Sequence, residues 1–286
     1  MAKDLVVDKA ENGYANIRED GDNVVAMAKA APSRFAVKSP YLRECLAEFI
    51  GTAILLAFGD GVVAQVVLGG GKNGDYTHIS ICWGIAVFFG IHFSGGVSGA
   101  HLNPAVTTTL ALFNRFEWRK VPGYILAQVL GAFFGAFIVY IVYYPQFNHI
   151  DPDRMTTQGV FATYPNAHVT NATAFLTEVI GTALLLGGIF AIGDQKNQPV
   201  SKFTSPAAVA ILVIGIGMAF GMNSGYAINP ARDFGPRLFS SLAGWGSKVF
   251  TLNDHYFWVP IVGPLVGGAV GGLFYTGFVE IHHPQE

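Results

Sequence analysis

Charged residues are scarce in this 286-residue chain, at 13% of the total, whereas an ordinary soluble domain is about 25% charged. The formal net charge is −2, so the strongly basic surface typical of nucleic-acid-binding proteins is absent and we expect no nucleic-acid partner. The chain has two cysteines, Cys45 and Cys82, and both lie in apolar segments. We therefore expect both thiols to pack as small hydrophobic groups rather than to form a disulfide or bind a metal.

The sequence also lacks a recognisable catalytic or metal-binding pattern. Its eight histidines show no metal-ligand spacing, and no nucleophile, base and orienting group can be assembled from its residues. The three glycines at 69–71 are not followed by the Lys-Ser/Thr helix start of a phosphate loop. We therefore expect no enzyme activity, no cofactor and no metal.

Apolar residues and glycine are abundant instead. Hydrophobic residues make up 51% of the chain, which has 35 glycines, and the mean hydropathy is +0.42. A helix needs about 20 apolar residues to cross a bilayer. Six segments meet this requirement, at 42–68, 79–95, 121–144, 174–192, 205–223 and 257–281. Two shorter apolar stretches begin at Pro104 and Pro230, and we expect re-entrant half-helices there. The predicted fold class is an all-α membrane protein with six transmembrane helices and two half-helices.

The distribution of charge predicts the orientation. Residues 1–40 mix charged and small residues without a signal peptide, and we expect a disordered cytoplasmic tail. The membrane domain is expected at 41–282. Basic residues near the spans are more numerous on the side that carries both termini, which predicts that both termini are cytoplasmic, with the plasma membrane as the expected compartment. On that side are Lys29, Arg34, Lys38, Arg43, Arg115, Arg119, Lys120, Lys196 and Lys202; on the other are Lys72, Arg154, Arg237 and Lys248.

The membrane domain contains an internal repeat. Residues 47–56 match residues 177–186 closely, which defines one repeat at about 41–144 and a second at about 174–282. Each repeat holds three spans, an odd number, so the second copy must enter the membrane from the opposite face. This is an inverted repeat, with its special site expected at the midplane where the two halves meet.

The tripeptide Asn-Pro-Ala occurs once in each repeat, as Asn103, Pro104, Ala105 and as Asn229, Pro230, Ala231. Asparagine is a good N-cap and proline fits the first helical turn, so each motif predicts the start of a half-helix. Two such starts that face each other would place positive dipole ends at the waist of a pore. We expect the asparagine amides to donate to a permeating oxygen; helix capping alone is the alternative.

Three charged side chains lie within or beside the apolar segments. Glu48 and Glu178 occupy the same position in the two repeats, and a buried charge in a membrane needs a partner. We expect each to accept hydrogen bonds from backbone N–H groups of its own half's re-entrant loop; a proton or cation site is the alternative. Arg232 directly follows the second motif and is expected in the pore wall, where its positive charge repels cations. The alternative is that Arg232 forms a salt bridge with Asp233.

With these motifs, residues 41–282 resemble the major intrinsic protein family, the aquaporins, and in particular its aquaglyceroporin branch, which includes the bacterial glycerol facilitator. Four features resemble that branch: Asp233 after the second Asn-Pro-Ala-Arg, Arg237 four residues later, the pair Pro260-Ile261 in the last span, and Tyr143 late in the third span. The resemblance implies a selectivity filter formed by Trp83, Gly217, Tyr226 and Arg232. It also implies that Gly217 leaves space open, and that the hydroxyl of Tyr226 narrows or polarises the opening.

The resemblance implies a passive channel for glycerol, water and other small neutral solutes that excludes ions and protons. A strict water channel is one alternative, and an ion-coupled secondary transporter is another. The resemblance further implies a homotetramer in the lipid bilayer with one pore per subunit. Small residues at the spacing of Gly131 with Gly135, and of Gly267 with Gly271, would allow close helix contact between subunits. Packing within one subunit is the alternative use of these glycines.

Overall fold

The computed structural model describes residues 7–9, 14–19, 22–27, 36–198 and 200–284 of the chain. The chain divides into two compact units, Met1–Ser39 and Pro40–Glu286. The second unit is the membrane domain, and it contains all the residues predicted to carry function.

The described part of the first unit forms a small antiparallel sheet. Strands β1 (Val7–Lys9), β2 (Tyr14–Glu19) and β3 (Asp22–Met27) lie in the order β1-β2-β3. Glu19 pairs with Asp22, and the sequence between them is Asp-Gly, a pair that favours tight hairpin turns. These strands lie within residues 1–40, where the sequence predicted a disordered tail, and the disorder of that tail stays a prediction.

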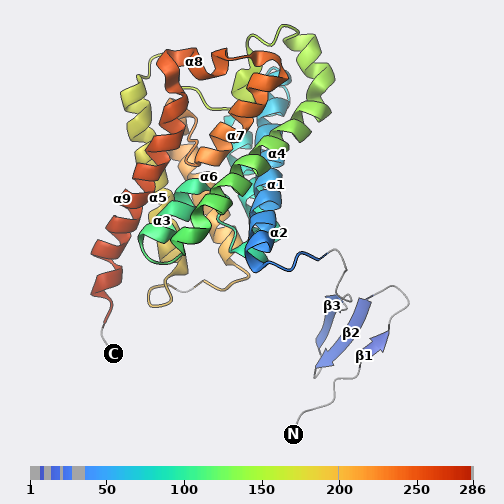
Figure 1. Cartoon of the computed structure of the whole chain (residues 1–286), viewed down its shortest axis with the longest axis vertical. Helices are drawn as coiled ribbons and strands as arrows, with labels where there is room; N and C mark the ends of the chain where they lie inside the picture. Colours follow the sequence, from blue (N-terminus) through green and yellow to red (C-terminus); the bar gives the residue numbers. More distant parts are fainter. Residues whose placement is uncertain (1–6, 10–13, 20–21, 28–35, 199, 285–286) are drawn as a thin grey trace. The chain divides into compact units, whose positions relative to one another are not determined.

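The six expected membrane spans are present as helices in the described residues (Figure 1). They are α1 (Pro40–Leu68), α2 (Tyr76–Ser98), α4 (Val121–Ile150), α5 (Asn171–Gly193), α6 (Ser205–Ser224) and α9 (Val259–Phe278). Helix α4 runs through Pro145 to Ile150, beyond the predicted end at residue 144. Its extra turns are anchored by Phe147, which is fully buried and whose ring stacks on that of Phe161.

The two predicted half-helices are α3 (Pro104–Leu112) and α7 (Pro230–Ser240). Helix α3 lies in the half of the membrane domain that carries the chain ends of that domain, and α7 in the half beneath α8 (Figure 1). These two halves are called here the terminal end and the α8 end. Helix α8 (Lys248–His255) and a π-helical turn, η3 (Ser241–Trp245), were not predicted. Short 3₁₀ turns complete the fold: η1 (Trp118–Lys120), η2 (Thr157–Val160), η4 (Tyr256–Trp258) and η5 (Glu280–His282).

Glycines bring the first and third helices of each repeat into close contact, α1 with α4 and α5 with α9. A Cβ added at Gly131 of α4 would lie 2.2 Å from the carbonyl oxygen of Phe49 in α1. A Cβ added at Gly271 of α9 would lie 2.1 Å from the carbonyl oxygen of Ala183 in α5. Gly135 and Gly267 make equivalent approaches to the same partner helices. These glycines therefore serve packing within one chain, the alternative that the sequence left open.

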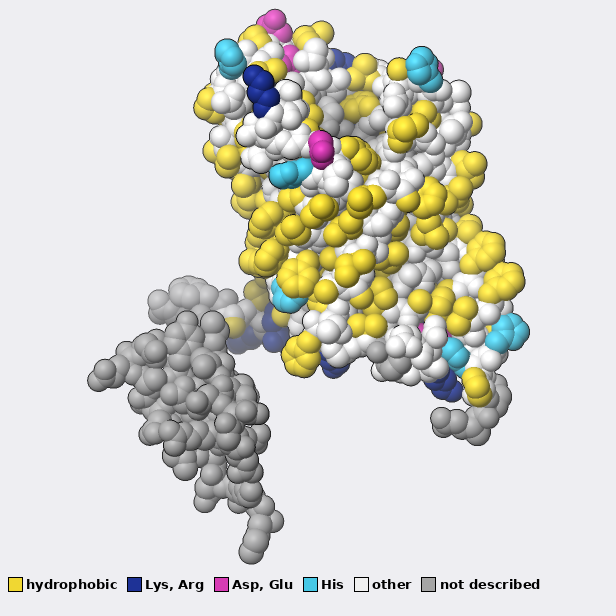
Figure 2. Space-filling view, turned by 180° about the vertical axis from the view of Figure 1, so that it is seen from behind, with side chains coloured by type: hydrophobic (Ala, Val, Ile, Leu, Met, Phe, Trp, Pro, Cys, Tyr) yellow, Lys and Arg dark blue, Asp and Glu magenta, His cyan; other side chains and the backbone are white. Residues whose placement is uncertain are grey.

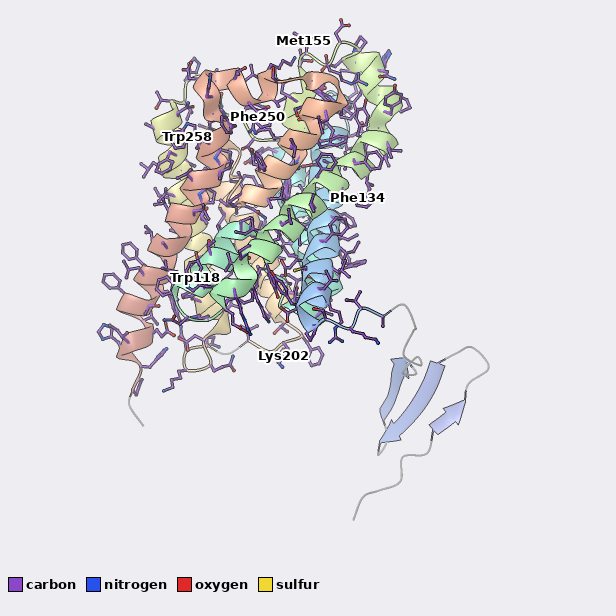
Figure 3. The ribbon with its side chains drawn as sticks, in the orientation of Figure 1. Trp118, Phe134, Met155, Lys202, Phe250 and Trp258 are labelled. Atoms are coloured by element: carbon purple, nitrogen blue, oxygen red, sulfur yellow. The ribbon has the colours of Figure 1, made fainter. Side chains whose placement is uncertain are left out.

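The outer surface of the membrane domain fits a lipid environment. Large hydrophobic side chains on α4, α5, α6 and α9 are exposed, including Val142, Leu176, Ile211 and Leu273. Hydrophobic side chains cover the middle of the face seen in Figure 2, whereas charged side chains lie toward its two ends. Two exposed tryptophans, Trp258 nearer the α8 end and Trp118 nearer the terminal end (Figure 3), lie where interfacial aromatic residues are common. The chain is an integral, multi-pass membrane protein.

Candidate functional site

The two asparagine motifs start the half-helices as predicted. The side-chain oxygen of Asn103 accepts a hydrogen bond from the backbone N–H of Ala105 at 2.8 Å. The side-chain oxygen of Asn229 accepts from Ala231 at 3.0 Å and from Arg232 at 3.2 Å. Proline occupies the first turn of each half-helix, where its missing N–H costs nothing. The capping role of both asparagines is confirmed.

The same asparagines also join the two repeats. The amide nitrogen of Asn103 donates to the carbonyl oxygen of Ile228 at 2.9 Å, and that of Asn229 donates to the carbonyl oxygen of Leu102 at 2.8 Å. The start of each half-helix is therefore tied to the loop that precedes the other. An amide group has two N–H donors, so each asparagine keeps a second N–H beyond the one that joins the repeats.

The loops before the motifs have an unusual backbone. Ala100 and Leu102 have positive φ values of 54° and 53°, and the matching residues Tyr226 and Ile228 have values of 39° and 43°. Residues with a side chain rarely adopt this left-handed region, and each instance costs about 1–3 kcal/mol. The strain recurs at matched positions of the repeat, so strong contacts must hold both loops.

In the first repeat, Glu48 supplies those contacts. It is fully buried and accepts hydrogen bonds from the backbone N–H of His101 at 2.9 Å and of Leu102 at 2.7 Å. The hydroxyl of Ser98 and the amide of Gln128 donate to the same carboxylate at 2.6 and 2.8 Å. Hydrogen bonds to a charged acceptor are about twice as strong as neutral ones, so one side chain fixes the strained loop.

In the second repeat, Glu178 makes the equivalent contacts. It is fully buried and accepts from the backbone N–H of Ala227 at 2.9 Å and of Ile228 at 2.7 Å. The hydroxyl of Ser224 donates to it at 2.7 Å. The predicted hydrogen bonds of both glutamates to their own re-entrant loops are confirmed.

A cavity of about 250 Å³ runs beside these loops. One part of its wall is apolar and comes from α2, α3, α5 and α6, through Val87, Ile91, Val106, Leu110, Leu185, Ile189, Val209 and Val213. Another part is polar, with Asn103, Asn229 and the loop residues Gly99 and Gly225. A glycine can present only backbone, so peptide groups themselves face the cavity at those two positions. The wall of the cavity therefore combines apolar side chains with polar groups.

Three of the four expected filter residues, Trp83, Tyr226 and Arg232, line this cavity together. The guanidinium carbon of Arg232 lies 4.1 Å from the centre of the Trp83 ring, within the range of a cation–π contact. The fourth residue, Gly217, lies behind Tyr226. A Cβ added at Gly217 would lie 2.6 Å from Cζ of Tyr226, so the aromatic ring fills the space at this glycine. The expectation that Gly217 leaves open space is therefore wrong.

The hydroxyl-bearing tip of Tyr226 is directed at α6. Its oxygen would lie 2.8 Å from the Cβ added at Gly217, and its ring contacts that of Tyr76 edge-on, with 6.5 Å between the ring centres. The hydroxyl of Tyr76 donates to the carbonyl oxygen of Gly217 at 3.2 Å. Tyr226 thus forms a wall of the cavity and is supported by two helices, α2 and α6.

Arg232 is paired differently from the expected alternative. Its guanidinium lies 3.4 Å from Asp60 of α1 and donates to the carbonyl oxygen of Phe161 at 3.3 Å. Asp233 instead pairs with Arg237 at 2.7 Å and accepts from the backbone and hydroxyl of Thr163. The predicted alternative, a salt bridge between Arg232 and Asp233, is therefore wrong. Asp233 and Arg237 together hold the loop that carries Phe161.

None of the expected supporting residues is part of the cavity wall, and three of them, Tyr143, Pro260 and Ile261, also have no part in holding the loops. The hydroxyl of Tyr143 donates to Gln65 at 3.4 Å within a separate surface groove between α1, α2 and α4. Pro260 is buried in the first turn of α9 and Ile261 is half-buried beside it. Asp60 was missed by the sequence analysis, although an acidic residue deep in an apolar span is itself a signal of function.

Residues 36–275 match the family described as major intrinsic protein. The chain belongs to this family. Relatives of this major intrinsic protein include Aquaporin-9 of Homo sapiens, 43% identical over 263 residues, which cover 90% of this chain and 89% of that protein. Aquaglyceroporin-2 of Rhizophagus irregularis is 43% identical over 252 residues, which cover 86% and 78% of the two chains.

A solved structure is also similar. The X-ray structure of the aquaglyceroporin from Plasmodium falciparum superimposes with a TM-score of 0.78 at 38% sequence identity, and covers 84% of this chain and 97% of that one. This major intrinsic protein therefore shares both fold and sequence with aquaglyceroporins over nearly its whole membrane domain.

Proposed function

We propose that this chain is a passive channel for glycerol and water, and for other small neutral solutes, that excludes ions and protons. The observation that carries the proposal is the cavity whose wall combines apolar side chains and polar groups with Trp83, Tyr226 and Arg232. The relatives named as aquaglyceroporins support the same function.

The chemistry of the wall fits a polyol. Glycerol has a carbon edge and a hydroxyl edge. Trp83 and Tyr226 offer aromatic faces to the carbon edge, and Arg232 and the loop peptide groups offer hydrogen bonds to the hydroxyls. The second amide N–H of Asn103 and of Asn229 is free to donate to a passing oxygen at the waist.

Ions are excluded by the same geometry. An ion that enters the narrow cavity loses its hydration shell, and the apolar side of the wall offers no replacement. The N-terminal ends of α3 and α7 both point to the waist and add positive potential against cations. No step requires ATP or a coupled ion, so we propose that net flow follows the solute gradient.

We further propose that both termini face the cytoplasm and that the protein resides in the plasma membrane as a homotetramer. Arg115 pairs with Glu280 and Lys120 with Glu44, close to the two ends of the membrane domain, and Lys202 lies at the terminal end (Figure 3), which supports the orientation. The tetramer rests on the family resemblance, because the glycine pairs are used within the chain. The mass of the protein in detergent tests the tetramer directly.

Stopped-flow light scattering on proteoliposomes tests the channel, with separate gradients of water, glycerol and urea. We expect water and glycerol fluxes well above those of protein-free vesicles. Fast water flux without glycerol flux would support a strict water channel, and glycerol flux that depends on an ion gradient would support a transporter. Ile189→Trp fills the cavity and should reduce both fluxes. Ile211→Trp, on the exposed face of α6, is the matched control.

A further inference from the structure

A buried carboxylate lies directly behind the filter. Asp60 of α1 is fully buried, and its Oδ1 lies 3.4 Å from Nη1 of Arg232. Its neighbour Gly59 is in contact with Trp83, since a Cβ added there would lie 2.3 Å from the indole ring. Helix α1 therefore backs both the aromatic and the cationic side chain of the filter.

The other charges near Arg232 are already balanced. Asp233 and Arg237 form their own buried pair, with Nε of Arg237 at 2.7 Å and Nη2 at 3.1 Å from the two carboxylate oxygens. Asp60 is thus the carboxylate that balances Arg232. Within the described residues, its second oxygen, Oδ2, has no hydrogen-bond partner, so neutral donors do not compete with the guanidinium for this charge.

We propose that Asp60 is a specificity-determining positioning residue of this channel. It holds the guanidinium of Arg232 against Trp83 and cancels its net charge, so that the filter presents hydrogen-bond donors without a net charge. This inference rests on the proposed function, because it concerns what the same filter rejects.

The physical reason is that a filter for neutral solutes must reject both cations and anions. An isolated arginine beside a narrow, low-dielectric passage repels cations but attracts anions, and rings of Arg or Lys favour anion passage in pores. A buried ion pair retains the donors of the arginine and removes most of its long-range field. The Asp60–Arg232 pair therefore lets the filter reject both signs while it binds neutral hydroxyl groups.

The test uses the sign of the reversal potential in planar bilayers under a potassium chloride gradient. Asp60→Asn keeps the shape and one acceptor but leaves Arg232 unbalanced. We expect a chloride leak with a preference over potassium of about tenfold, which corresponds to about 1.4 kcal/mol. Arg232→Val leaves Asp60 without its partner and should leak potassium instead, in recordings at alkaline pH that keep an unpaired buried carboxylate ionised. Asp153→Asn removes a carboxylate from an exposed loop after α4 and is the control, with no expected leak.

The double variant Asp60→Asn/Arg232→Val gives the decisive result. Both charges are then absent, so we expect the sign-selective leak of each single variant to disappear. A double variant that leaks potassium as Arg232→Val does would overturn the proposal, and so would wild-type selectivity in Asp60→Asn. If Asp60→Asn does not fold, the comparison of Arg232→Val with the double variant remains a complete test.

Glycerol flux, measured on the same preparations, keeps the two claims apart. Absence of glycerol flux in the wild-type protein would contradict the proposed function. Wild-type glycerol flux together with unchanged ion selectivity in Asp60→Asn would contradict only the role of Asp60.

Discussion

The ring of Tyr226 occupies the space that Gly217 leaves on α6, because a Cβ added at Gly217 would lie 2.6 Å from Cζ of the tyrosine. The two positions therefore act as one unit. The size of the opening depends on the tyrosine, and the glycine determines where the tyrosine can lie.

This coupling predicts a non-additive pair of substitutions. Gly217→Ala should push the ring into the cavity and reduce glycerol flux more than water flux, because glycerol is the wider solute. In a Tyr226→Ala background, the same Gly217→Ala change should have no further effect. Flux measured by stopped-flow on all four proteins checks this. An equal relative loss of glycerol flux in both backgrounds would show that Gly217 acts independently of the ring.

The hydrogen bonds of Glu48 and Glu178 to their loops predict that neutral variants of these residues are less stable but gain no new pH dependence. Glu178→Gln removes the charge and one acceptor from two backbone N–H groups in a strained loop. Hydrogen bonds to charged groups contribute about 1.5–3 kcal/mol each, so we expect a lower thermal unfolding temperature and reduced glycerol flux. Glu48→Gln should behave similarly.

The pH dependence of selectivity should remain that of the wild type in both glutamine variants. The contrary observation is a wild-type flux that a proton gradient drives and that either glutamine variant abolishes. That result would restore the alternative of a proton site at these glutamates.

The close contact between α9 and α5 predicts that substitutions at two glycines of α9 have different effects on stability. Gly271 approaches the carbonyl oxygen of Ala183, whereas a Cβ added at Gly277 meets nothing within 4 Å. Gly271→Ala should destabilise the fold by about 1–3 kcal/mol through overpacking. Gly277→Ala should leave stability unchanged or raise it, because alanine favours helices by about 0.5–1 kcal/mol over glycine. Thermal unfolding in detergent measures both, and an equal loss in the two variants would argue against a specific crossing.

A contact at the terminal end predicts that the stability of the fold depends on pH under acidic conditions. Oδ2 of Asp194 lies 2.6 Å from Nε2 of His283 and accepts from the hydroxyl of Tyr275 at 2.8 Å. The hydrogen bond with His283 is the main cause that lowers the pKa of Asp194 from 3.8 to about 2. Because the folded pKa is depressed, the contact stabilises the fold above the ordinary pKa and is lost as pH falls through the folded pKa.

The unfolding temperature of wild type should therefore exceed that of Asp194→Asn at pH 5. This difference should shrink as the pH falls from about 4 toward about 2. Asp153→Asn, on an exposed loop, is the control for the loss of a carboxylate. A difference that stays constant to pH 2 would show that Asp194 acts through its shape and not its charge.

The sequence predicted those parts of the site that depend on local chemistry or on the repeat. Asparagine followed by proline fixes a helix start, so the positions of α3 and α7 follow from Asn103 and Asn229 alone. The matched positions of Glu48 and Glu178 predicted a shared role, and each glutamate does hold its own loop.

The remaining features depend on which helix faces meet, and a single sequence does not specify that. Asp60 and Arg232 are far apart in sequence, and only the packing of α1 against the loop around Phe161 brings them together. In the same way, the space at Gly217 is open or filled according to the direction of Tyr226. Helix α8 has little apolar character, so hydropathy gave no signal for it.

The central claim is that glycerol moves passively through the pore of this chain. The most direct test is the final level of labelled glycerol in proteoliposomes, measured with and without an imposed proton or sodium gradient. The account predicts rapid entry that stops when the inside and outside concentrations are equal, under every gradient. Accumulation above the outside concentration, or entry no faster than into protein-free vesicles, would contradict it.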